Sequence, residues 1–428
     1  MTTTALLFHN ASQTVTCAGP ARARRGAEMN DCGVRRDTGV VVEDATIRAI
    51  DDASVLRAAY PHAQTVDCHG GVLTPGFVDS HTHAIFGRAR SEEQELRATG
   101  VPYMEIAKRG GGIHASVRDL RTRDESALFE LAMPRLRSLA SHGVTTVEVK
   151  SGYGLTLADE LKTLRIARSL AEQLPMRVVP TWLGAHEIPL EYRDRANGRR
   201  EYVDLLVNDM LPEIAAKKLA RFADVFCEPG VFTIDESRTI LTAARAAGLG
   251  VKLHADELTS GGGAELAGEL RATSADHLAA ISDAGIAALA HAGTVATLLP
   301  GTMLFLGKPA QAPARRLIDA NVAVALATDF NPGTSPTTNF PLILTLGVSQ
   351  LRLSVAEAMI AATVNGAAAL GLADRVGQLA PGFSADLALW DVGDVRELPY
   401  WYGTMRCRAS WARGKPCHAH DLGLTFSP

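Results

Sequence analysis

Eight short runs rich in β-branched and other apolar residues alternate with longer stretches of helical period between Phe77 and Asp329. Such alternation is typical of repeated βα units and a parallel sheet. The stretch has about 250 residues, the usual size of a (β/α)8 barrel. The eight runs are GFVDSH, TTVEVK, RVVPTWLGAH, ADVFCE, GVKLHADE, SADHL, TVATLLP and VAVALATDF. The sequence therefore predicts an α/β protein built on a TIM-like (β/α)8 barrel.

Strand-like segments flank the predicted barrel on both sides. TGVVVEDATIRAID precedes it, and GQLAPGFSADLALWDV follows a predicted helix pair, LSVAEAMIAATVNGAAALGL. Because a small sheet needs several strands to be stable, we expect the two ends to form one composite β-sandwich domain. The predicted boundaries are 1–74 and 376–428 for this domain and 75–375 for the barrel, although the length alone suits three ordinary domains equally well. The Arg-rich insertion AGPARARRGAE is predicted to be an exposed loop.

Composition excludes several classes of protein. The 428 residues carry a formal net charge of −4 and no Lys/Arg-rich run, which argues against nucleic acid and favours a small-molecule partner. The chain has no apolar stretch of about 18 residues and its start lacks the features of a secretory signal, so we expect no membrane association and a cytoplasmic location. The six cysteines form no C-x-x-C pair and are predicted to be reduced thiols.

Several of the eight predicted strands end with His or Asp, residue types that bind metal ions. His81 and His83 follow the first run, His254 lies in the fifth and Asp329 in the eighth. Alternate residues of a strand share a face, and the carboxyl ends of barrel strands converge, so these four side chains can meet. His and Asp are suitable ligands for Zn²⁺ or Fe, and catalytic sites leave a position open for water. The alternative, histidines satisfied by backbone carbonyls in the core, fits a barrel rim poorly.

Further polar side chains fall at the same predicted rim. Asp329 could accept a proton from water as well as bind the ion, while Glu257 and His277 could move protons or stabilise charge. Their alternative role is to support metal ligands through hydrogen bonds. The other residues at strand ends are Lys150, Tyr153, His186 and Glu228.

Several segments resemble a known family. PGFVDSHTH, KLHADE and TDFNPG are similar to the metal-site segments of the amidohydrolase superfamily. The blocks FGRAR, KRGGGI, EVKSGYGL, TWLGAHEIPLEY, DVFCEPGVF, HADELTSGGGAELA, SADHL and ATDFNPGT resemble those of the imidazolonepropionases of histidine degradation. The blocks lie between Pro75 and Gly371, and SGYGL, LGAH and DFNPG are distinctive in combination.

This resemblance implies a metal-dependent cyclic amide hydrolase. The family opens the ring amide C–N bond of 4-imidazolone-5-propanoate with metal-activated water, giving N-formimidoyl-L-glutamate, and uses one Zn²⁺ or Fe ion per subunit. We expect a homodimer. Matched by motif, the metal ligands are His81, His83, His254 and Asp329, the catalytic residues are Asp329, Glu257 and His277, and the substrate-binding residues are Arg90, Tyr153, His186, Glu257, Asn331, Gly333 and Thr334.

The chemistry of the substrate residues agrees with this resemblance. The planar fork of Arg90 can bind a propionate in a bidentate manner. Tyr153 and His186 can hydrogen-bond a small polar ring, and Gly333 would let the backbone approach the ligand. The alternatives are that Tyr153 anchors a loop and that Asn331-Pro332-Gly333 is only a turn.

Two residues depart from the family pattern, and two other functions compete. Arg88 and Arg271 stand where the family usually has Gly. The fourth strand ends with Glu228 and not with the Lys that binuclear relatives carboxylate, so we expect a single ion and no carbamate on Lys150. One rival function is deamination of a nucleobase or aminoimidazole, using the same ligands. The other is a non-catalytic assembly scaffold, for which loss of metal ligands would be usual; here none is lost.

Overall fold

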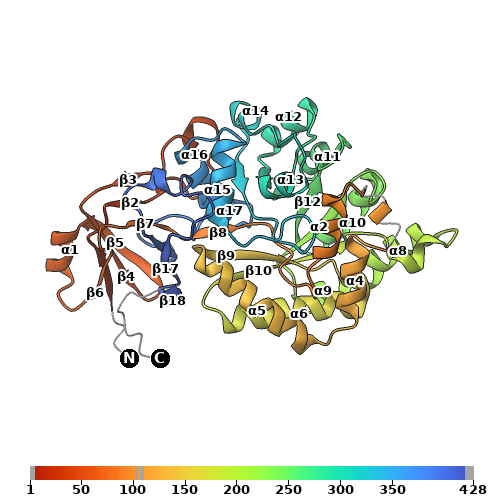
Figure 1. Cartoon of the computed structure of the whole chain (residues 1–428), viewed down its shortest axis with the longest axis horizontal. Helices are drawn as coiled ribbons and strands as arrows, with labels where there is room; N and C mark the ends of the chain where they lie inside the picture. The colour runs from red at the N-terminus through yellow and green to blue at the C-terminus, as the bar shows by residue number, and fades with distance from the viewer. Residues whose placement is uncertain (1–4, 102–104, 107–109, 420–428) are drawn as a thin grey trace.

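A nearly closed barrel of eight parallel strands forms the core of the larger part of the molecule. The computed structural model describes residues 5–101, 105–106 and 110–419, and Figure 1 shows the barrel on one side and a smaller body of strands on the other. All eight predicted strands are confirmed, in sequential order around the barrel. They are β8 (Phe77–Asp79), β9 (Val144–Lys150), β10 (Arg177–Ala185), β11 (Phe222–Cys227), β12 (Gly250–Ala255), β13 (Ser274–His277), β14 (Val295–Leu298) and β15 (Val324–Leu326).

The first and last strands meet just beyond their carboxyl ends. The backbone N–H of His83 donates to the carbonyl of Phe330 (2.8 Å), and that of Asp329 donates to the carbonyl of His81 (3.0 Å). Below them the Thr328 hydroxyl donates to a carboxylate oxygen of Asp79 at 2.6 Å. This seam draws residues from the two ends of the barrel sequence into contact at its carboxyl-terminal face.

Helices surround the barrel, and several begin at side chains suited to capping. Thr156 caps the helix predicted at ADELKTLRIARSLAEQL, and Thr233 with Glu236 forms a capping box. The barrel-associated helices are α2 (Ser91–Ala98), α4 (Ile113–Arg121), α5 (Glu125–Ser141), α6 (Leu157–Gln173), α7 (Leu190–Arg193), α8 (Gly198–Leu205), the π-helix η2 (Leu206–Met210), α9 (Leu211–Ala216), α10 (Ile234–Ala246), α11 (Gly263–Glu269), α12 (Asp283–Ala292), α13 (Pro300–Phe305), α14 (Ala314–Asp319), α15 (Phe340–Ser349), α16 (Val355–Ala362) and α17 (Val364–Ala368).

The smaller body is a sandwich of two sheets. One sheet has the order β5-β4-β1-β6, and the other, β18-β17-β16-β7-β2-β3, combines strands from both ends of the chain. The strands are β1 (Leu6–His9), β2 (Gln13–Val15), β3 (Val34–Arg35), β4 (Thr38–Glu43), β5 (Thr46–Asp52), β6 (Gln64–Asp67), β7 (Val72–Pro75), β16 (Leu387–Trp390), β17 (Cys407–Ala412) and β18 (Lys415–Ala419), with short helices η1 (Gly26–Met29), α1 (Ala53–Ala59) and η3 (Val395–Glu397). The composite domain is confirmed, while its predicted boundaries stay a prediction.

Apolar side chains from both sheets fill the space between them. Phe8 of β1 meets Trp411 of β17 edge to face, with 4.9 Å between ring centroids, and Leu73 and Leu387 belong to the same buried cluster. Trp390 packs in the other direction, onto Phe77 at the start of the barrel, with ring centroids 5.0 Å apart. The sandwich is thus packed directly against the barrel.

The Arg-rich insertion is not simply an exposed loop, and the prediction was wrong for its centre. Arg24 is only 5% exposed and Met29 is fully buried. The Asn365 side chain accepts a hydrogen bond from the Arg24 backbone N–H (2.8 Å) and donates one to the Arg24 carbonyl (3.0 Å). These tertiary contacts offset the desolvation of the polar loop, which local composition could not reveal.

Two predictions concern the chain as a whole: the state of its cysteines and its relation to a membrane. All six cysteines are free thiols, five of them buried. Burial raises the pKa of the Cys407 thiol above its usual range. Among the helices described, none has the length and apolarity needed to cross a membrane.

Candidate metal centre and substrate site

Three histidines and an aspartate meet inside the carboxyl-terminal mouth of the barrel. His81, His83, His254 and Asp329 are all buried. One Asp329 oxygen, Oδ1, lies 3.5 Å from His81 Nε2 and 3.6 Å from His83 Nε2. His254 Nε2 lies 3.3 Å from His83 Nε2. The structure therefore brings together the four side chains that the sequence predicted as ligands.

Buried carboxylates orient two of these imidazoles. His81 Nδ1 is 2.6 Å from Asp276 Oδ2, and His254 Nδ1 is 3.0 Å from Asp224 Oδ2. A histidine that donates its Nδ1–H to a carboxylate keeps a lone pair on Nε2, which is the usual arrangement behind a metal-binding histidine. The hydrogen bond to Asp276 leaves Nε2 of His81 as the acceptor, while His254 Nδ1 meets Asp224 at ion-pair distance without forming a hydrogen bond.

These donors fit a divalent cation. Within the described part of the chain, the buried Nε2 of His81 makes no hydrogen bond. Burial, together with the nearby Lys150 charge, holds the pKa of His81 well below its ordinary value, and burial with the neighbouring His186 does the same for the pKa of His83. Neutral imidazoles and one carboxylate are the donor set that Zn²⁺ or Fe accepts.

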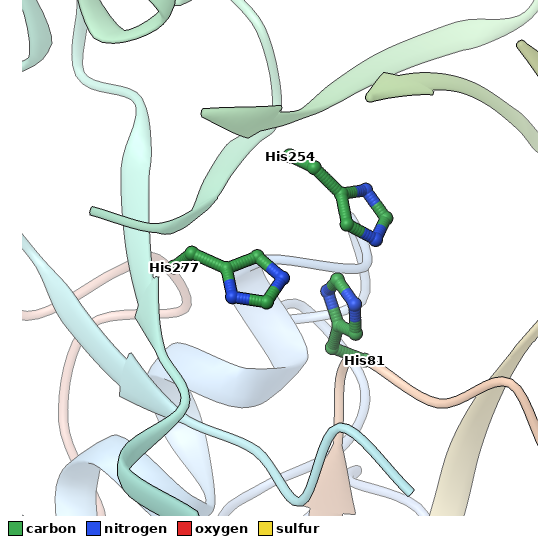
Figure 2. A group of neighbouring side chains, drawn as sticks. All are labelled: His81, His254 and His277. Atoms are coloured by element: carbon green, nitrogen blue, oxygen red, sulfur yellow. The ribbon is translucent and has the colours of Figure 1, made fainter. Parts of the chain in front are cut away.

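His277 joins the same cluster. One ring nitrogen of His277 lies within 4.8 Å of a ring nitrogen of His81 and of His254. Figure 2 shows the three rings directed toward one another. The backbone φ of His277, 78° at the end of β13, turns the side chain inward. Sequence reasoning gave His277 a proton-transfer role; its geometry also permits ligation. The signal was present in the sequence, because SADHL ends a barrel strand like the other ligand runs.

Asp329 is held in place by its own backbone and by Thr302. Its φ is 52°, and the Thr302 hydroxyl donates to Oδ2 at 2.6 Å. Burial raises the pKa of the Asp329 carboxyl to about 6. Because Oδ2 is engaged by Thr302, Oδ1 is the oxygen presented to the histidines.

A charged network lies deeper in the barrel, and sequence reasoning missed most of it. Lys150 Nζ contacts Glu148 (2.7 Å) and Asp224 (2.8 Å), and Lys252 Nζ contacts Glu148 (2.8 Å) and lies 3.5 Å from Asp276. The sequence did indicate this network, because alternate side chains of a strand share a face. The segments E-V-K in β9 and K-L-H in β12 therefore each place two polar or charged side chains on one face of the strand. Burial alone would lower the pKa of Lys150, but the surrounding carboxylates outweigh it and raise that pKa. Lys150 is therefore an ammonium and a poor candidate for a carbamate.

Glu257 faces His277 from the loop after β12. Glu257 Oε2 is 3.7 Å from His277 Nδ1. In the metal-free protein, burial, with the nearby Asp329 and Glu228 carboxylates, raises the pKa of Glu257 to about 8, so this group keeps its proton to a higher pH than an exposed carboxyl. Glu228 holds the loop, because its carboxylate accepts the backbone N–H of Glu257 (3.2 Å) and of Thr259 (2.8 Å).

Arg90 is buried beside the loop that follows Asp329. Its side chain is 9% exposed and lies 3.8 Å from Glu93, and its Nε and Nη1 make no hydrogen bond to the described residues. A Cβ at Gly333 would overlap the Arg90 guanidinium. Gly333 thus leaves room for the Arg90 side chain, and close approach of a ligand to the Gly333 backbone stays a prediction.

The other residues of the Asn331–Thr334 segment are engaged in a turn. Asn331 Oδ1 accepts the backbone N–H of Gly333 and of Thr334, each at 2.8 Å. Its Nδ2 donates to the Asp329 carbonyl at 2.7 Å. These bonds match the turn alternative, and contact of Asn331 or Thr334 with substrate stays a prediction.

Tyr153 and His186 line the other side of the mouth. Their ring centroids are 5.3 Å apart, and His186 stacks on His83 with centroids 5.1 Å apart. His186 Nδ1 lies 2.9 Å from the Gly152 carbonyl, and burial lowers the pKa of His186 to about 3. The neutral ring therefore donates from Nδ1 and keeps an acceptor at Nε2.

Sequence comparison identifies the family. A model described as the amidohydrolase family matches residues 108–418. The chain is 46% identical over 415 residues to the imidazolonepropionase of Geobacillus kaustophilus, covering 96% of this chain and 97% of that protein. It is 49% identical over 402 residues to the imidazolonepropionase of Symbiobacterium thermophilum, covering 93% of each. The chain belongs to the imidazolonepropionases of the amidohydrolase family.

Solved structures similar to the chain share its fold at low sequence identity. An adenosine deaminase from Xanthomonas campestris with bound Zn superposes with a TM-score of 0.72 at 19% identity, over 99% of this chain and 94% of that one. The guanine deaminase of E. coli has a TM-score of 0.73 at 17% identity, over 98% of this chain and 100% of the other. At these identities the likeness establishes the fold alone.

The two departures from the imidazolonepropionase pattern are both exposed. Arg88 is exposed, and its backbone N–H donates to Asp119 (3.0 Å). Arg271 is also exposed and occupies a left-handed turn with a φ of 43°, a conformation that Gly adopts more easily. In the block KRGGGI, Lys108 and Arg109 lie outside the described residues.

Proposed function

We propose that the chain hydrolyses the ring amide of 4-imidazolone-5-propanoate to N-formimidoyl-L-glutamate. The observation that carries this substrate is Arg90. Its buried guanidinium has two nitrogens without hydrogen bonds, and its charge is close enough to His186 to help lower the pKa of that imidazole. An unsatisfied buried guanidinium beside the histidine cluster calls for a carboxylate, which the propionate of this substrate supplies.

We assign the ring to the space between Arg90 and the histidines. His186 Nε2 can accept a hydrogen bond from a ring N–H, because its Nδ1 is turned to the Gly152 carbonyl. The Tyr153 ring flanks the same space, 5.9 Å from the His83 ring between centroids. Together these side chains would fix the propionate and one edge of the ring, leaving the ring carbonyl directed at the metal centre.

His81, His83, His254 and Asp329 would hold the ion, with His277 adjacent. When bound, Zn²⁺ or Fe would lower the pKa of a water molecule and polarise the carbonyl. Asp329, whose Oδ1 lies 3.5 Å from His81 Nε2, would accept the proton of the attacking water. Glu257, whose pKa is raised in the metal-free protein, can deliver a proton to the departing ring nitrogen as the C–N bond breaks, and His277 beside it can relay or stabilise charge.

The experiment compares the imidazolone with a panel of nucleobases, using purified and metal-analysed protein. We expect metal-dependent loss of imidazolone absorbance and formation of N-formimidoyl-glutamate. Arg90→Ala should raise KM for the imidazolone strongly, whereas Arg88→Ala, two residues away and exposed, should leave it unchanged. Deamination of a nucleobase that is indifferent to Arg90→Ala would favour the rival activity. Absence of a bound metal would favour the scaffold.

Three finer features stay proposals. We retain one ion per subunit, Zn²⁺ or Fe, to be decided by elemental analysis, since His₃Asp ligation suits both. We also retain the homodimer, which sedimentation equilibrium tests, and the cytoplasmic location, which fractionation of the producing cells tests.

A further inference from the structure

One ammonium group touches both of the carboxylates that orient metal-facing histidines. Lys150 Nζ is 2.8 Å from Asp224 Oδ2, the same oxygen that lies 3.0 Å from His254 Nδ1. The same Nζ is 3.8 Å from Asp276 Oδ2, the oxygen that lies 2.6 Å from His81 Nδ1. Lys150 lies on β9, next to β8, and its Nζ makes no ion pair with a proposed ligand among the described residues.

Lys150 is the only ammonium among the described residues in ion-pair contact with Asp224, whereas Asp276 also lies 3.5 Å from Lys252 and accepts the Ser274 hydroxyl at 2.6 Å. Glu148, Asp224 and Asp276 are all fully buried at the side chain, and so are Lys150 and Lys252. Three buried carboxylates this close would repel one another, and removing one partner of a buried ion pair leaves an uncompensated charge. Lys252 balances mainly Glu148, which it contacts at 2.8 Å, and it also donates to the Ser80 carbonyl.

We propose that Lys150 is a positioning residue for the metal centre: through Asp224 and Asp276 it sets the tautomer and orientation of His254 and His81, and so determines how tightly the ion is held. This inference rests on the metal site proposed above. The consequence is specific. Without the ammonium, the two carboxylates are free to rotate, and Nδ1 of each histidine loses the fixed carboxylate oxygen beside it.

The test measures how fast bound metal leaves the protein. Wild-type protein loaded with Co²⁺ is mixed with excess chelator, and loss of the visible Co²⁺ spectrum gives the dissociation rate. Lys150→Met, which keeps the length of the side chain, should release the ion about 10- to 100-fold faster, the usual effect of losing an outer-shell partner. Unfolding of the metal-free forms is measured separately, because a merely structural role would lower that stability without changing the release rate.

Isosteric variants keep the proposal testable if Lys150→Met does not fold. Asp224→Asn should release Co²⁺ about 10- to 100-fold faster. Glu148→Gln is the matched control, because Glu148 bonds Lys150, Lys252 and Thr181 but no histidine; it should release the ion at close to the wild-type rate. Where both Lys150→Met and Asp224→Asn fold, the double variant should release the ion little faster than either alone, since both act on one contact.

The outcomes separate this inference from the metal site itself. Wild-type protein that binds no ion would overturn both. Wild-type protein that binds one ion, with Lys150→Met and Asp224→Asn releasing it at the wild-type rate, would overturn only the positioning role. Equal acceleration in Glu148→Gln and Asp224→Asn would also overturn it, because the effect would then belong to the buried network in general.

Discussion

Gly333 offers a direct test of how Arg90 is placed. A methyl group at position 333 would occupy the space of the Arg90 guanidinium, so Gly333→Ala must displace that group. The backbone φ of Gly333 is not positive, so an Ala at this position adds no backbone strain of its own. The variant therefore perturbs the proposed carboxylate anchor while leaving Arg90 in the sequence and the metal cluster untouched.

The expected change in KM follows from the number of hydrogen bonds that Arg90 can donate to the propionate. Two of its nitrogens, Nε and Nη1, make no hydrogen bond to the described residues and are available to a propionate. A hydrogen bond to a charged group contributes about 1.5–3 kcal/mol. If the displaced fork loses the equivalent of one such bond, KM for the imidazolone should rise roughly 10- to 150-fold. Arg90→Ala, which loses both hydrogen bonds to the propionate, should raise KM for the imidazolone further than Gly333→Ala does.

The assay follows imidazolone absorbance over a range of substrate concentrations. An imidazolone lacking the propionate should be turned over equally by wild type and Gly333→Ala, because neither would use Arg90. Gly393→Ala is the matched control, since its added methyl would meet only Glu397 at 3.7 Å. A wild-type KM for the carboxylated substrate in Gly333→Ala would refute the reasoning.

Two further predictions concern groups around the ion. In metal-free protein, Glu257 has a pKa raised from 4.5 to about 8, so the folded state keeps a proton that the unfolded state releases, and the free energy of unfolding should fall as pH rises from about 4.5 to 8. Denaturant titrations should show this slope reduced by one proton in Glu257→Gln; an unchanged slope would contradict the assignment. Thr302→Val removes the hydroxyl that donates to Asp329 Oδ2 and should weaken metal binding about 10-fold, as measured by competition with a chelator. Thr181→Val, which loses a bond to Glu148 instead, should bind metal normally.

The convergence of the four candidate ligand side chains was predictable because their positions follow from simple periodicity. His81 and His83 alternate after a strand, and His254 and Asp329 close similar apolar runs, so a barrel had to bring them to one rim. The composite sandwich was predictable for a related reason, since an isolated strand at each end of the chain needed a partner.

Contacts that depend on three-dimensional packing were not predictable. Strand alternation places Lys150 and Lys252 on one face of their strands, but only the three-dimensional packing shows them to be fully buried against carboxylates. Arg24 looked like part of a solvated loop until its backbone was seen bonded to Asn365, far along the chain. The Gly333 requirement arises from the Arg90 side chain, which approaches across space and leaves no trace in sequence spacing.

The seam between β8 and β15 also has a meaning for the order in which the protein matures. His81 and His83 leave the ribosome early, while Thr302 is made only after six further strands and Asp329 after seven. The hydrogen bonds that join His81 to Asp329 and His83 to Phe330 form only when the ring closes. A nascent chain that ends before β15 has all three proposed ligand histidines but lacks Asp329, so the four-residue cluster is complete only when the last strand has been made and paired.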